Sequence, residues 1–115
     1  MPPQNIPITI SKRGNHCEID PAHVHADPND TIVWTNDTSN NIVIFFPNPG
    51  AVFDDFSGDG SGKAHKEVAN GQQHNRQVKG GPTLSPRGSH SHPYSVYCAA
   101  TNSFAHGGSD GDVDV

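Results

Sequence analysis

The chain is short of large apolar residues, and this limits the core that it can build. Hydrophobic residues make up 31% of its 115 residues, whereas glycine and proline contribute 12 and 10 residues. No apolar run approaches the ~20 residues that a membrane helix needs. The start, Met1-Pro2-Pro3-Gln4, has no charged segment followed by an apolar one, as a signal peptide would. We therefore expect a single domain over residues 1–115, with a thin core, long loops, no membrane span and no signal peptide in this sequence.

Clustered positive charge is also missing. Lysine and arginine number 7 against 12 aspartates and glutamates, which gives a formal net charge of −5, and the basic residues are dispersed. A nucleic-acid backbone is bound by concentrated positive charge that displaces its counterions. We expect no nucleic-acid partner. The partner expected is an unknown protein or redox partner, and the chain itself is expected to be a monomer.

Catalysis has little support in the sequence. Serine, histidine and aspartate are all abundant, but their presence alone does not assemble a triad. Cys98 beside a histidine could act as a thiol nucleophile. However, this cysteine belongs to a strand motif that the fold explains. We expect a protein without enzymatic activity.

The apolar residues that are present alternate along short segments, as they do in half-buried β-strands. Ile6, Ile8 and Ile10 share one face, and Pro7 between them predicts an edge strand. A sustained 3.6-residue period, which would indicate long helices, is absent. Further strands are expected at Ala22–Ala26, Thr31–Thr35, Ile42–Phe46, Lys63–Val68, Asn75–Val78, Tyr94–Cys98 and Asp112–Val115, the first two forming a hairpin. Seven or eight strands at this spacing predict an all-β fold, a Greek-key β-sandwich.

The segment from Pro47 to Gly62 is dense in proline and glycine and predicts a long excursion between strands. Within it, Asp55-Phe56-Ser57-Gly58-Asp59-Gly60 places oxygen-bearing residues at alternate positions before a glycine, as a calcium loop does. The twelfth position, where such a loop carries a bidentate glutamate, is Lys66. We expect a flexible acidic loop, with a calcium site as the alternative.

Two segments together resemble the cupredoxins, the family of plastocyanin and pseudoazurin. They are Cys17–Trp34, reading CEIDPAHVHADPNDTIVW, and Tyr94–Cys98, reading YSVYC. The resemblance implies a cupredoxin-like sandwich in which copper is held between two loops, one after the tryptophan strand and one beginning at the cysteine. It also implies an extracytoplasmic protein, periplasmic or secreted, because cupredoxins are mostly exported.

The copper ligands of the family are incompletely matched. A type 1 site uses one thiolate, two imidazoles and a weak axial ligand, often methionine. The resemblance puts the thiolate at Cys98, but Asn40 stands at the position of the first histidine. His106 is the best candidate for a second ligand. The only methionine is Met1, so no axial methionine exists.

Two hypotheses follow from this mismatch. The leading one is a non-catalytic binding or structural module without a cofactor. The resemblance places Cys17 beneath the copper-end loops near Cys98, so that these two cysteines would form a disulfide. The alternative is a copper-binding electron-transfer or copper-carrier protein, which predicts a free thiol. It would use Cys98, His106 and a further histidine such as His65, His90 or His92.

Histidine is frequent, with 8 residues in the chain. His23 and His25 are two apart on an expected strand and so share one face, and His90 and His92 repeat this spacing. We expect exposed strand histidines, with a weak zinc, nickel or copper site as the alternative. The isolated histidines are expected at the surface; these are His16, His65 and His74.

Overall fold

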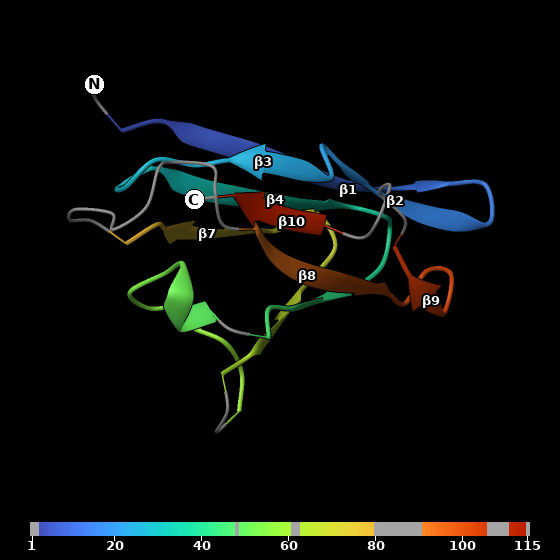
Figure 1. Cartoon of the computed structure of the whole chain (residues 1–115). Coiled ribbons are helices and arrows are strands. Elements are labelled where there is room, and N and C mark those ends of the chain that lie inside the picture. The colour runs from blue at the N-terminus through green and yellow to red at the C-terminus, as the bar shows by residue number, and fades with distance from the viewer. Residues whose placement is uncertain (1–2, 48, 61–62, 80–90, 106–110, 115) are drawn as a thin grey trace.

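The computed structural model describes residues 3–47, 49–60, 63–79, 91–105 and 111–114, which fold into two facing β-sheets (Figure 1). These residues contain no α-helix, only a short 3-10 turn, η1, at Pro49–Ala51. Their strands are β1 (Asn5–Arg13), β2 (His16–Asp20), β3 (His23–His25), β4 (Thr31–Asp37), β5 (Ile42–Phe45), β6 (His65–Val68), β7 (Gln73–Gln77), β8 (Ser91–Cys98), β9 (Ser103–Phe104) and β10 (Gly111–Asp114). The all-β prediction is therefore confirmed. The described part of the chain contains no helix that is long and apolar enough to cross a membrane.

The first sheet has the strand order β2-β1-β4-β7. The strands β1 and β4 run parallel, and the other two pairs are antiparallel. The alternation in β1 is confirmed, because Ile8 and Ile10 are fully buried and Ile6 packs at the margin of the core. The edge position predicted from Pro7 is wrong for the strand as a whole. Pro7 does lie in the half of β1 that pairs only with β4, since pairing with β2 begins at Thr9.

The second sheet has the order β3-β10-β8-β5-β6, and β9 pairs with β8 beside this path. The hairpin predicted from Ala22–Ala26 and Thr31–Thr35 is wrong, because β3 pairs in parallel with β10 and belongs to the sheet opposite β4. The Asp27–Asp30 turn between them connects the two sheets. It is tied to the residue directly after β7 by a hydrogen bond from the Asn29 N–H to the Val78 carbonyl, 3.1 Å long.

The described part of the chain has ten strands, against the seven or eight predicted, and two of the ten match none of the predicted segments. The first addition is β2, which forms a tight hairpin with β1 around Gly14, whose φ of 63° suits glycine. The second is β9, whose two residues are too short to leave an alternating pattern.

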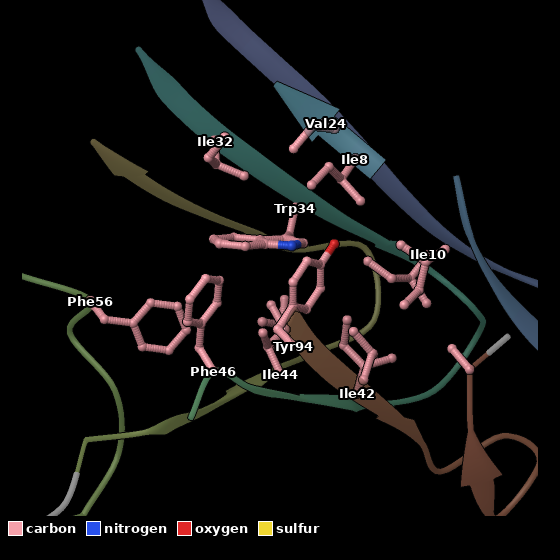
Figure 2. Packing of buried hydrophobic residues seen from close by; sticks show 14 of the residues in the cluster. Ile8, Ile10, Val24, Ile32, Trp34, Ile42, Ile44, Phe46, Phe56 and Tyr94 are labelled. Carbon is pink, nitrogen blue, oxygen red and sulfur yellow. The ribbon is translucent and has the colours of Figure 1, made fainter. Parts of the chain in front are cut away.

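The core between the sheets is centred on Trp34, which is fully buried. Trp34 extends from β4 toward Phe46 and Tyr94 of the facing layer (Figure 2), with ring centroids 6.5 and 5.7 Å away. Phe53 and Phe56 of the predicted excursion pack on the same indole at 5.9 and 6.0 Å. The excursion is therefore anchored to the core by its few apolar residues.

Candidate functional site

Cys17 and Cys98 meet inside the sandwich, one from each sheet. Cys17 lies on β2 and alternates with the buried Ile19; Cys98 ends β8, where Val96 also points inward. Both cysteines are free thiols with 0% exposure. The two side chains lie close enough that Cys17 contributes to raising the pKa of Cys98. The two cysteines thus form a buried thiol pair that spans the two sheets.

The surroundings of Cys98 favour its neutral thiol. Burial is the main cause that raises the pKa of Cys98, followed by the neighbouring thiol of Cys17. The Cys17 Sγ also lies 3.8 Å from the Thr101 Oγ1, which in turn lies 2.9 Å from the Ser103 Oγ. Because the thiolate is the nucleophile and the metal ligand, Cys98 is held in its less reactive form while it stays buried.

The chain turns back directly after Cys98. The Thr101 N–H lies 3.3 Å from the Cys98 carbonyl, and β9 then pairs with the end of β8. At Ala105 the chain has returned to Val96, with an N–H to carbonyl distance of 2.7 Å. The predicted ligand His106 follows and lies outside the described residues, as does His90.

Asn40, at the position expected for the first copper ligand, is exposed, and its oxygens accept hydrogen bonds within the turn that it belongs to. Its side-chain oxygen accepts from the Asn41 N–H at 2.8 Å. Its backbone carbonyl accepts from the Asn36 amide at 2.7 Å and from the Thr38 hydroxyl at 2.9 Å. Asn36 is itself 1% exposed. Sequence reasoning singled out Asn40 but missed Asn36, which holds the turn from inside.

The two loops do approach each other at this end of the sandwich. The Ala99 N–H donates to the Asn41 carbonyl at 3.1 Å, and Cys98 pairs with Ile42 at the start of β5. The turn that carries Asn40 and the turn that follows Cys98 are therefore neighbours. This is the arrangement that a ligand site shared by two loops requires.

The other histidines divide between surface and interior. His23, His25 and His65 are exposed, as predicted, and His65 lies with its ring 5.9 Å from that of Phe45. His90 and His92 were predicted to be exposed. This is wrong for His92, which is half-buried, whereas His90 lies outside the described residues. The surface prediction for His74 is also wrong, because this residue is only 5% exposed.

His74 packs into the aromatic core. Its ring stacks on the indole of Trp34, and its Nε2 lies 3.0 Å from the Phe56 carbonyl. Burial lowers the pKa of His74, although the hydrogen bond to Phe56 opposes this shift. No apolar residue marks this position in the sequence, because β7 consists only of polar residues.

The aspartates of the possible calcium loop are used by the loop itself. The Asp55 carboxylate accepts from the Ser57 N–H at 2.8 Å, which is the main cause that lowers its pKa. Asp59 accepts from the Glu67 N–H at 2.8 Å and from the Lys66 ammonium at 3.3 Å. The backbone bond from Glu67 is likewise the main cause that lowers the pKa of Asp59. These contacts favour the acidic-loop interpretation.

Comparison with known proteins found no match. No protein-family model matches it, and no curated protein sequence is significantly similar to it. Among the described residues, no group of three or more histidine, cysteine or acidic side chains is arranged to hold a metal ion.

Proposed function

We propose that this protein is a cupredoxin-like, Greek-key β-sandwich that has lost the type 1 copper ligand set and acts as a non-catalytic binding or structural module. In this proposal the protein works outside the cytoplasm and needs no cofactor. The cysteine that would hold copper instead forms a disulfide with Cys17 across the two sheets. The single observation that carries the proposal is that Cys17 and Cys98, one from each sheet, are both fully buried in the same core cluster, with the Cys17 Sγ 3.8 Å from the Thr101 Oγ1 in the turn after Cys98.

Two features of the site support this proposal. A copper thiolate needs imidazoles beside it and surroundings that favour the charged form. Cys98 is instead buried against a second thiol, and the pKa of Cys98 is raised. Asn40 offers an amide oxygen that the Asn41 N–H already occupies.

The disulfide has a defined chemistry. Cys17 or Cys98, as a thiolate, attacks a disulfide carried by an oxidant such as a thiol oxidoreductase, releasing one thiol of that oxidant. The remaining cysteine then attacks the mixed disulfide and releases the second thiol. Two protons and two electrons leave the cysteines, and one S–S bond forms. Because burial disfavours the thiolate, this exchange takes place before the sheets close.

The competing function is copper electron transfer or copper transport through Cys98, His106 and a further histidine. The observation in its favour is the contact between the turn of Asn40 and the turn after Cys98, with the Ala99 N–H 3.1 Å from the Asn41 carbonyl. The copper function needs free thiols and a histidine imidazole close to Cys98.

Copper titration separates the two functions. Fully reduced protein and its Cys98→Ser variant are mixed with Cu(II) without oxygen, and the visible spectrum is recorded. The proposed function predicts no intense thiolate-to-copper band in either protein. A strong band in the wild-type protein that is missing in the variant would establish the copper function instead.

A further inference from the structure

One tripeptide that neither candidate function uses occurs twice in this chain. Asn-Asp-Thr stands at residues 29–31 and again at residues 36–38. Each copy fits Asn-X-Ser/Thr, the acceptor sequence for N-linked glycans, in which the middle residue is not proline. No other asparagine of the sequence begins such a triplet. Because the two copies are identical, a difference between them as acceptors comes from their places in the fold.

The first copy begins at the surface. Asn29 is exposed in the Asp27–Asp30 turn that connects the two sheets, with a φ of 73°. Its backbone holds the turn, because its N–H lies 3.1 Å from the Val78 carbonyl and its own carbonyl lies 3.3 Å from the Gln77 Nε2. Among the described residues, no hydrogen bond engages the side-chain amide of Asn29. A sugar on the Asn29 Nδ2 therefore extends into solvent without breaking a contact of the fold.

The second copy begins in the interior. Asn36 is 1% exposed, and its Nδ2 donates to the Asn40 and Val68 carbonyls at 2.7 and 2.9 Å. A side-chain amide nitrogen carries two hydrogens, and N-glycosylation replaces one of them. A glycan at Asn36 would remove one of these two bonds and place a bulky polar group in the core. The fold is therefore compatible with a glycan at Asn29 and incompatible with one at Asn36.

The exposed copy also lies away from the thiol pair. The strand β4 begins at Thr31, directly after the Asn29 turn, and ends at Asp37, about 20 Å further along. Cys98 pairs with Ile42, just beyond the turn that follows β4. A glycan at Asn29 therefore leaves the Cys98 end of the sandwich uncovered.

We propose that Asn29 is the acceptor of an N-linked glycan and that Asn36 is not. The proposal rests on the extracytoplasmic location in the proposed function, because N-glycan transfer takes place outside the cytoplasm. The donor is an oligosaccharide joined to a lipid through a pyrophosphate. The Asn29 Nδ2 attacks the anomeric carbon of the first sugar, so that a C–N bond forms and the C–O bond to the pyrophosphate breaks. The amide loses one proton and the lipid pyrophosphate leaves, without oxidation or reduction.

Secretion of the full chain from eukaryotic cells, behind a cleavable secretion signal, tests the proposal. The protein is treated with a peptide N-glycosidase in water labelled with heavy oxygen, which converts each glycosylated asparagine into a labelled aspartate. Peptide mapping by mass spectrometry is expected to find the label at Asn29 in most secreted chains and at Asn36 in none. Thr31→Ala should abolish the modification although Asn29 remains, and the matched control Thr31→Ser should retain it.

Chains retained in the cells are mapped in the same way, because the oligosaccharide is transferred to chains that are still folding. A chain modified at Asn36 should be confined to this retained fraction, and circular dichroism shows that the secreted protein is folded. The same map shows whether Cys17 and Cys98 are linked, so that failure of the disulfide in the proposed function is distinguished from failure of this proposal. The proposal is wrong if Asn29 carries no label in either fraction, or if secreted, folded protein carries the label at Asn36.

Discussion

The imidazole of His74 lies nearly parallel to the indole of Trp34, with ring centroids 5.9 Å apart and 20° between the planes. This stack ties the polar strand β7 to the centre of the core. The hydrogen bond between His74 Nε2 and the Phe56 carbonyl ties it further to the segment that follows η1. The titratable side chain of His74 therefore lies in the core, beside the point where Phe56 of the Pro47–Gly62 segment packs.

Stability should fall on acidification because of His74. Its pKa is lowered in the folded protein by burial, from an ordinary value of 6.5. Below this ordinary value the unfolded chain binds a proton at His74 more readily than the folded protein does. The contribution of neutral His74 to the free energy of unfolding is therefore complete above the ordinary pKa and is lost as the pH falls below it. Urea unfolding at pH 7.5 and 5.5 should show a smaller pH effect in His74→Phe than in the wild type. The exposed His65→Phe should keep the full effect, and an equal effect in all three proteins would contradict this account.

Asn36 should matter far more than Asn40. The Asn36 side chain is buried and makes four hydrogen bonds, donating to the Asn40 and Val68 carbonyls and accepting from the N–H and hydroxyl of Thr38. Asn36→Ala leaves buried groups without partners and should lower the free energy of unfolding by about 2–4 kcal/mol. Asn40→Ala, at an exposed position, should stay within about 0.5 kcal/mol. Denaturant unfolding of both variants gives the comparison, and similar losses would show that Asn36 does not hold the turn.

Phe53 should be a main anchor of the excursion. It is 1% exposed and contacts Trp34, Phe46 and Phe56. Phe53→Ala should lower stability by about 3–5 kcal/mol, the range for a fully buried phenylalanine. The matched control is Phe104→Ala, because Phe104 is 51% exposed, and it should lower stability by less than about 1.5 kcal/mol. Equal losses in thermal or urea unfolding would contradict the observed packing.

Reduction should destabilise the oxidised protein if the disulfide proposal is right. A bond between Cys17 and Cys98 closes a loop of about 80 residues, which in the chain-entropy model stabilises by about 4 kcal/mol. Unfolding in the presence of a strong reductant should therefore occur at a lower denaturant concentration than without it. The variant Cys17→Ala should be insensitive to reductant, whereas a wild-type protein with the same insensitivity would speak against the bond.

The fold was predictable where apolar residues alternate. Ile8, Ile10 and Val96 follow this pattern, and each lies in the core, as does Ile44 from the continuous apolar run Ile42–Phe46. The hairpin assigned to Ala22–Ala26 failed because a three-residue strand carries no information about its partner. In the folded protein β3 pairs with β10 rather than with β4, and Val24 packs into the core from that position.

The candidate site was predictable only in part. The importance of Cys98 and Asn40 came from a resemblance, and the structure places their turns next to each other. The burial of His74 had no signal in the sequence, because its neighbours in β7 are all polar. Asn36 likewise looked like one more residue of a polar turn, since its four hydrogen-bond partners are brought together only by the folded chain.

The most direct test of the central claim is a count of free thiols in unreduced protein made in an oxidising compartment. The protein is unfolded in denaturant with an alkylating reagent, and its intact mass is measured before and after reduction. The account predicts no alkylated cysteine before reduction, two after it, and a proteolytic fragment in which Cys17 and Cys98 are linked. Two alkylated cysteines without reduction would contradict the disulfide and leave Cys98 free for the copper function.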